Sequence, residues 1–220
     1  GDGIEGAVIA AGGDVLLAGR VGDDANLFGG QVTLDALVAG DALTVAGNLL
    51  LEGPIKGNLR AVGGRIVVHN KVDGNAAIIG GRIDVRDGAQ IMGKATMAGG
   101  KLYVAGKFDR TLKAAAREIV IAGQIAGDVR LTAKEITVLP SARIGGDLIY
   151  RSPEAIRIHD NAKIAGDVTF VQSDLMGEGE GGMFALVGGF HLMTVLGLVL
   201  VAAVLVLVFP RLFPAIDRRL

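Results

Sequence analysis

The chain has 220 residues, a formal net charge of −1, 35 glycines, no cysteine and no tryptophan, and only 4% aromatic residues. The lack of cysteine excludes a disulfide framework, a thiolate nucleophile and cysteine-ligated zinc or iron–sulfur sites. The near-neutral charge gives no reason to expect nucleic acid as a partner, and the glycine-rich, aromatic-poor composition is typical of a repetitive protein rather than an ordinary enzyme.

An aliphatic or aromatic residue followed by a turn, usually of Gly, Asp or Asn, recurs along most of the chain. It occurs ten times, and six of the nine steps between occurrences are 17 residues long, the others 19 or 20. The repeats begin at Ile4, Val21, Val38, Ile55, Val72, Ile91, Phe108, Ile125, Ile144 and Ile164. So regular a period predicts a solenoid.

A pair of glycines falls about nine residues into five of the ten repeats, as at Gly63-Gly64. It predicts a second corner, where the backbone needs positive φ or close approach. Beyond this corner apolar and polar residues alternate, for example at Ile66 and Val68, which indicates strands with one face inward. About three short strands per repeat are too close together for hairpins, so we expect rungs stacked in parallel at roughly 4.8 Å. The predicted fold is an all-β solenoid at residues 1–172, a parallel β-helix of about ten 17-residue rungs.

Irregular repeats fit the same coil. The extra residues at Asp87-Gly88, Pro140-Ser141 and 159–161 are predicted to form small bulging corners. The seventh repeat lacks the glycines, but Ile119 and Ile121 stay in phase, so we expect a rung there as well.

A polar, glycine-rich segment at 173–183 follows the repeats and is predicted to be a linker. From Phe184 to Phe209 the chain is apolar except for His191 and one threonine, and no charge occurs from Leu192 onward in this segment. About 20 helical residues span the ~30 Å hydrocarbon layer. We therefore predict one transmembrane helix at 184–209, with His191 as an interfacial polar residue at its outer end.

The charges that flank this span predict its orientation. Three acidic residues lie in the linker, whereas Arg211, Arg218 and Arg219 lie in the tail at 210–220. Because arginine is enriched on the cytoplasmic side, we expect a single-pass protein of the cell membrane with a cytoplasmic C-terminus and a periplasmic or extracytoplasmic β-helix. This topology requires an export signal, and a chain that begins at Gly1 fits a cleaved signal peptide as well as a shortened sequence.

The rung pattern, with its Gly-Asp and Gly-Gly corners, resembles the bactofilin-like, polymer-forming proteins of bacteria from about Ile4 to Val171. The segment 142–153 (ARIGGDLIYRSP) and the apolar span that ends in FPRLF at 209–213 are similar to the exported branch of that family, which carries a signal peptide and C-terminal membrane helices. The resemblance implies a right-handed parallel β-helix that assembles end to end. Typical bactofilins are cytosolic and lack this span.

No pattern in the chain predicts an active site. His69 and His159 fall on the fourth and ninth rungs, roughly 24 Å apart, which is too far for a shared metal. The strict hexads of β-helical acyltransferases are absent, as are the long cleft-forming loops of pectin-degrading β-helices. Each glycine pair leads into a strand rather than a helix, so no nucleotide site is indicated. We predict no catalytic residue, no cofactor and no metal, and hence a protein that is not an enzyme.

Two charge patterns remain. Asp or Asn recurs at one corner of successive rungs, at Asp24, Asp41, Asn58, Asn75, Asp128, Asp147 and Asp167. We predict that these side chains stack and interpret them as Asx turns, with a calcium stripe as the alternative. Residues 1–55 contain 8 acids and 1 base, residues 56–117 contain 12 bases and 4 acids, and residues 118–180 contain 10 acids and 6 bases. A basic belt between acidic ends suits an acidic partner or a neighbouring rod, although a solvated surface explains much of it.

These observations support two hypotheses of function. In the first, the protein is a membrane-anchored scaffold or polymer-forming protein whose partners are lipid and other copies of itself. Ile4 and Val21 are then the expected assembly end, because a β-helix exposes unpaired backbone at each end. In the second, the protein is an accessory subunit that docks on a larger integral-membrane complex. Neither involves nucleic acid.

Overall fold

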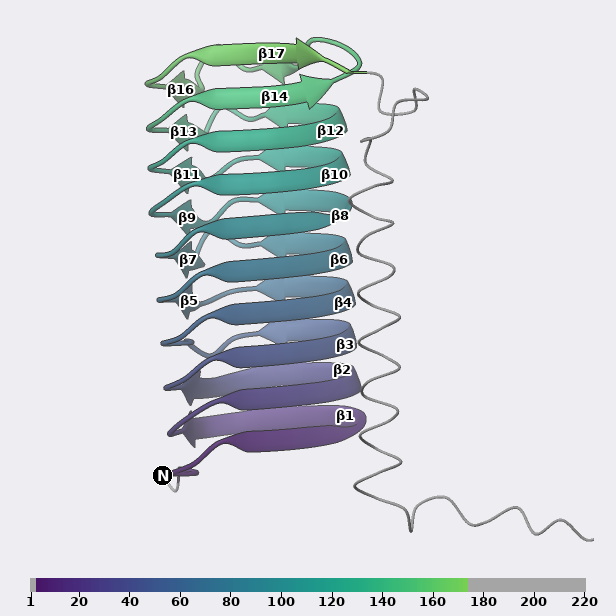
Figure 1. Cartoon of the computed structure of the whole chain (residues 1–220), viewed down its shortest axis with the longest axis vertical. Helices are drawn as coiled ribbons and strands as arrows, with labels where there is room; N and C mark the ends of the chain where they lie inside the picture. Colours follow the sequence, from purple (N-terminus) through teal and green to yellow (C-terminus); the bar gives the residue numbers. More distant parts are fainter. Residues whose placement is uncertain (1–2, 174–220) are drawn as a thin grey trace, which may run out of the picture. The chain divides into compact units, whose positions relative to one another are not determined.

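The computed structural model describes residues 3–173, which form an all-β parallel solenoid of ten rungs (Figure 1). The strands belong to two sheets, one of eleven strands and one of six. No helix in residues 3–173 is long and apolar enough to cross a membrane. The predicted span at 184–209, the tail at 210–220 and the linker from Asp174 onward lie outside the described residues.

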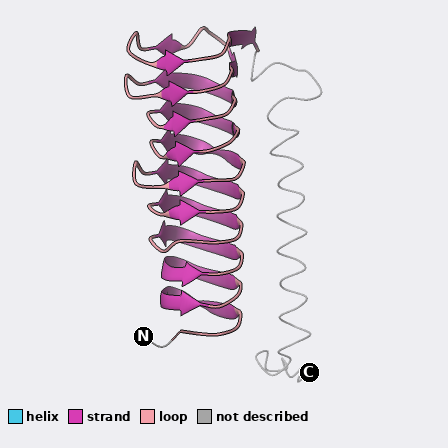
Figure 2. Ribbon diagram, turned by 90° about the vertical axis from the view of Figure 1, so that its left-hand side faces the viewer, coloured by secondary structure: helices cyan, strands magenta, loops and turns pink. Residues whose placement is uncertain are grey.

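The larger sheet contains one long strand from each rung. Its members are β1 (Val8–Val21), β2 (Ala25–Val38), β3 (Ala42–Leu51), β4 (Leu59–Val68), β6 (Ala76–Val85), β8 (Ala95–Val104), β10 (Leu112–Ile121), β12 (Val129–Val138), β14 (Leu148–Ser152) and β17 (Val168–Gln172), with β15 (Arg157–Ile158) paired to β12. The smaller sheet consists of β5 (Lys71–Val72), β7 (Gln90–Ile91), β9 (Lys107–Phe108), β11 (Gln124–Ile125), β13 (Arg143–Ile144) and β16 (Lys163–Ile164). Figure 2 shows these short strands stacked along one side of the solenoid.

Equivalent residues of successive repeats pair with each other. In the larger sheet Ile66 lies opposite Ile83, which lies opposite Leu102, and all three side chains are at most 2% exposed. The seventh repeat is a rung like the others, with Phe108 fully buried on β9. The predicted coil of ten rungs is therefore confirmed, and its core consists of apolar columns that run along the axis.

The glycine pairs bend a strand without ending it. In β4, Leu59 and Ala61 point inward before Gly63-Gly64, and Ile66 and Val68 point inward after it, so the inward-facing positions change parity at the pair. The prediction of three short strands per rung is wrong, because the backbone keeps its inter-rung pairing on both sides of the corner. Most rungs instead have one long bent strand, and the rungs from β5 to the C-terminal end add a two-residue strand.

Close approach between rungs accounts for the pair Gly63-Gly64. A Cβ atom at Gly63 would lie 2.7 Å from the carbonyl oxygen of Ala46, one rung earlier, and a Cβ at Gly64 would lie 2.8 Å from that of Gly47. Real Cβ atoms essentially never come so near to a backbone oxygen. Positive φ, the other predicted reason, applies to one glycine in the described residues, Gly19, with φ of 93°.

The inserted residues form turns, as predicted. The amide of Ala89 donates to the carbonyl of Arg86 (3.0 Å) across Asp87-Gly88, and the same bond closes the two later insertions, from Ala142 to Leu139 and from Ala162 to His159. Each insertion thus bulges out of its rung, and the strand that follows keeps the register of the coil.

Thr44 offers a test of the core. Its side chain is fully buried in an inward column, and its Oγ1 has no hydrogen-bond partner. Because a buried hydroxyl without a partner costs roughly 1–3 kcal/mol, we expect Thr44→Val to raise the free energy of unfolding by about 1 kcal/mol in urea titrations. Thr33→Val, at a half-buried outward position, is the control and should change little. A loss of stability in Thr44→Val would show that the hydroxyl has an unrecognised role.

Candidate functional site

The recurring Asp and Asn residues form a ladder between rungs. The backbone N–H of Asp41 donates to Oδ1 of Asp24 (2.7 Å), that of Asn58 to Asp41 (2.7 Å), and that of Asn75 to Asn58 (2.9 Å). On later rungs the N–H of Asp147 donates to Asp128 (3.3 Å) and that of Asp167 to Asp147 (2.9 Å). The predicted stacking is confirmed. The interpretation as Asx turns is wrong, because every one of these side chains except Asp167 on the last rung accepts from the next rung rather than from its own.

Asparagine and arginine limit the repulsion between stacked carboxylates. The Nδ2 of Asn58 donates to Oδ1 of Asp41 (3.0 Å), and Nη1 of Arg60 lies 3.1 Å from Oδ2 of the same aspartate. The backbone N–H of Asn58 is the main cause that lowers the pKa of Asp41, and Arg60 adds to the effect. Beside the smaller sheet, Nζ of Lys71 (2.9 Å) and Nζ of Lys56 (3.2 Å) lie against the carboxylate of Asp73. Both lower its pKa, and Lys71 has the larger effect. These contacts hold both carboxylates in the charged form.

The two ends of the solenoid expose its apolar interior. At the N-terminal end Val8, Ala10, Val15 and Leu17 are only partly buried, although their equivalents on later rungs are core residues. Ile4 is 48% exposed there and forms a bridge to Val21, which is fully buried. Of the two residues predicted for the assembly end, Ile4 therefore lies on the open surface and Val21 lies one rung inside.

The C-terminal end is open in the same positions. Val168 and Phe170 occupy the inward columns of the last rung and are 47% and 40% exposed, with Phe170 stacked on Tyr150 at 5.2 Å between ring centroids. The ladder also stops there: within residues 3–173 Asp167 accepts no N–H. At the other end, Ala7 donates no backbone bond within the same residues.

The histidines and acidic side chains of residues 3–173 do not come together in a reactive centre. His69 and His159 follow β4 and β15, on different rungs, as predicted. No group of three or more His, Asp or Glu side chains in residues 3–173 is placed to hold a metal ion. Two open hollows of about 310 and 660 Å³ adjoin β13 and β16, where small residues such as Gly145 leave room beside Arg143 and Lys163.

Many cations of the basic belt at residues 56–117 form ion pairs with acidic side chains of the same solenoid. Lys101 pairs with Glu118 on the next rung (2.6 Å), and Arg82 pairs with the almost buried Asp84 (3.1 Å). These cross-rung and local pairs were not predicted, because the sequence does not reveal which side chains become neighbours once each rung is in register.

Comparisons with protein-family models, with curated proteins and with solved structures found no match. The open ends, the ladder and the outer faces are therefore the features on which a functional proposal has to rest.

Acid should weaken the solenoid through the two shifted carboxylates. Because folding lowers the pKa values of Asp41 and Asp73, their contribution to stability is fully present above the unfolded-state value of about 4 and is lost as the pH falls through the lower folded values. We expect Asp41→Asn/Asp73→Asn to reduce the fall in unfolding free energy between about pH 5 and pH 2, measured by urea titration at each pH. Asp35→Asn, which removes an exposed carboxylate without an ion pair in the described residues, is the control. Parallel profiles for all three proteins would contradict this assignment.

Proposed function

We propose that the protein is a membrane-anchored, extracytoplasmic scaffold whose solenoids assemble end to end. The observation that carries this proposal is the match between the two open ends. Because every rung repeats the same positions, the last rung of one copy presents the columns that the first rung of another copy continues.

The apolar columns match first. In a head-to-tail contact Ile164 of one copy meets Ile4 of the next, and Val168 and Phe170 meet Val8 and Ala10. Each pair occupies one column of the coil, and Ile4, Val168 and Phe170 are 40–48% exposed in the single chain. Burial of these side chains and pairing of the free strand edges would stabilise the contact.

The ladder gives the contact a direction. Oδ1 of Asp167 is placed to accept the N–H of Ala7 in a following copy, as the ladder residues do within the chain. A head-to-head contact lacks this bond, because Ala7 has no side-chain acceptor. We therefore favour a polar filament of solenoids with parallel pairing throughout.

The membrane anchor in this proposal is the apolar segment 184–209, with the arginine-containing tail in the cytoplasm and the β-helix on the periplasmic or extracytoplasmic side. Right-handed coiling belongs to the proposal as well, on the strength of the family resemblance. Since the linker at 173–183 is short, solenoids joined end to end must lie nearly parallel to the membrane surface. The proposed role is structural and requires no cofactor.

Electron microscopy of the purified full chain tests the assembly. We expect filaments from the unmodified protein and none from Ile4→Lys, which puts a charge into the end contact. Leu16→Lys is the matched control, because Leu16 belongs to the same rung and is 73% exposed but points outward. Filaments that survive Ile4→Lys, or a monomer that co-purifies with one integral-membrane complex, would contradict the scaffold and favour the accessory subunit.

Topology has a separate test. Since the chain contains no cysteine, single cysteines can be introduced at Gly181 in the linker and Arg219 in the tail. The reagent is a maleimide that cannot cross the membrane holding the anchor, and it is applied to cells in which only the layers outside that membrane have been made permeable. It should label Gly181→Cys and leave Arg219→Cys unlabelled until detergent is added. The opposite labelling would reverse the orientation.

A further inference from the structure

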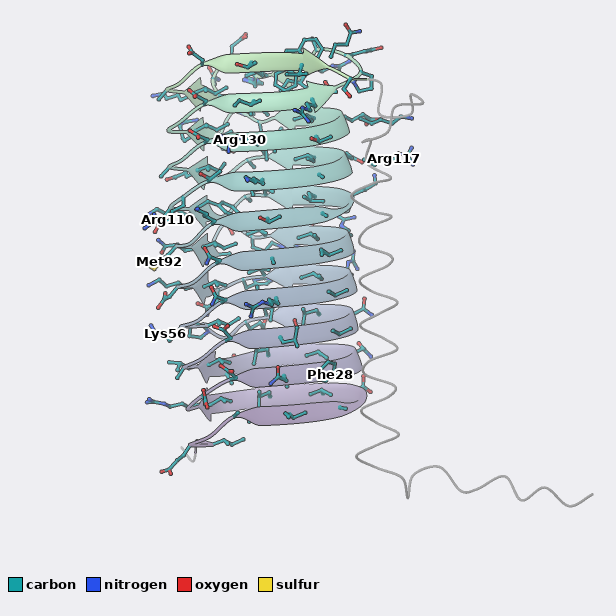
Figure 3. All side chains as sticks on the ribbon, viewed as in Figure 1. Phe28, Lys56, Met92, Arg110, Arg117 and Arg130 are labelled. Atoms are coloured by element: carbon teal, nitrogen blue, oxygen red, sulfur yellow. The ribbon has the colours of Figure 1, made fainter. Side chains whose placement is uncertain are left out.

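One outer face of the solenoid carries no acidic side chain. We call it the entry face and define it as the outward positions in the first half of each long strand. It has two columns, one from Ile9 to Thr169 and the other from Ala11 to Val171, with one residue of each column on every rung. Phe28 and Arg130, labelled in Figure 3, belong to it.

The entry face combines apolar and basic side chains. Its charged residues are Arg60, Lys113, Arg130 and Arg151, all exposed. Toward the N-terminal rungs it is apolar, with Ile9 78% and Val45 41% exposed and with Phe28, Leu43, Val62 and Ile79 partly exposed. The chain contains 23 acids among 220 residues, so average composition would place about two acids among the twenty positions of this face, and none is present.

The acids lie on other parts of the coil. Asp35, Glu52 and Asp84 point outward on the returning half of the rungs. Asp41 and Asp128 stand at the corner that precedes the entry face, where they pair with Arg60 (3.1 Å) and Arg130 (3.7 Å). Lys113 and Arg151 have no ion pair within residues 3–173. Two cations at the centre and C-terminal end of the face are therefore available to an external anion.

We infer that the entry face docks on the anionic headgroup surface of the bilayer that holds the anchor. This inference rests on the proposed function, in which a short linker keeps a nearly horizontal solenoid close to the membrane. A solenoid in that position must turn one side toward the lipid. The entry face suits this contact because apolar side chains enter the interfacial region, long cationic side chains reach the phosphates, and no carboxylate is brought against the negative surface.

The test uses the full chain reconstituted in vesicles of phosphatidylcholine alone or of phosphatidylcholine mixed with phosphatidylglycerol. Ala98→Cys and Ala105→Cys form a matched pair for a fluorescent label, because both residues belong to the sixth rung and are half-buried, but Ala98 is on the entry face and Ala105 is not. We expect lipids with a quencher in the headgroup to quench the label at Ala98 strongly when phosphatidylglycerol is present and weakly without it. The label at Ala105 should be quenched little in both.

Charge reversal identifies the residues responsible. Lys113→Glu/Arg151→Glu should abolish the phosphatidylglycerol-dependent quenching at Ala98. Arg65→Glu/Arg86→Glu makes the same change of charge at exposed positions off the face and should preserve it. Circular dichroism establishes that both double variants are folded. Equal quenching at the two labels, quenching independent of phosphatidylglycerol, or label–label contact at Ala98 that reports a second copy on the face would overturn the inference.

The two proposals fail separately. Filaments that form in detergent without entry-face quenching in vesicles would refute the lipid contact alone. Loss of filaments in Lys113→Glu/Arg151→Glu would mean that the face joins solenoids rather than lipid, which also contradicts the inference.

Discussion

Parallel stacking of each rung on its equivalent is the constraint on which the rest of the structure depends. At roughly 4.8 Å per rung, a residue meets the same position of the next repeat rather than a partner of another type. Apolar positions gain from this, since Ile66, Ile83 and Leu102 form one continuous column. At the bend of rungs such as that of Gly63 the backbones come too close for a Cβ atom, whereas the rungs with Ala46, Ala116 or Ala133 at the same position accommodate one.

The same constraint is unfavourable for charged columns, and the chain relieves it in three ways. Side-chain oxygens accept backbone N–H groups of the next rung, as Asp24 does from Asp41. Asn58 stands between Asp41 and Asn75, where it both donates and accepts. The charge in a column also changes from positive to negative between rungs, as where Lys101 lies opposite Glu118 and forms an ion pair with it. The hydrogen-bond and ion-pair partners of polar residues in this solenoid therefore come more from the rungs on either side than from their neighbours in sequence.

The period alone was enough to predict the coil, the number of rungs and the inward columns, because register follows once the repeat length is known. The continuous bend at Gly63-Gly64 was missed, since glycine pairs usually mark the end of a strand and nothing local shows that hydrogen bonds continue on both sides. The stacking of Asp24 and Asn58 with their equivalents was predicted, but their backbone N–H donors were missed for a related reason: an Asp at a corner has the same local sequence whether it closes a turn or bonds to the next rung. The membrane span at 184–209 stays a prediction from length and hydropathy, because it lies outside the described residues.

The repeat does not fix how many rungs the solenoid has or what its surfaces contact. The residues that determine its contacts must therefore lie at its two ends and on its outer faces. The ends inherit the repeat and are complementary without any special residue, which makes end-to-end contact the default that a solitary solenoid would have to prevent. The outward columns are under no such packing constraint, and the exposed Asp35 and Glu52 show that carboxylates are tolerated at outward positions of the returning half. The fold therefore does not require the entry face to be free of acids over ten rungs. A contact with an anionic surface supplies a physical reason, because each carboxylate on that face would oppose it.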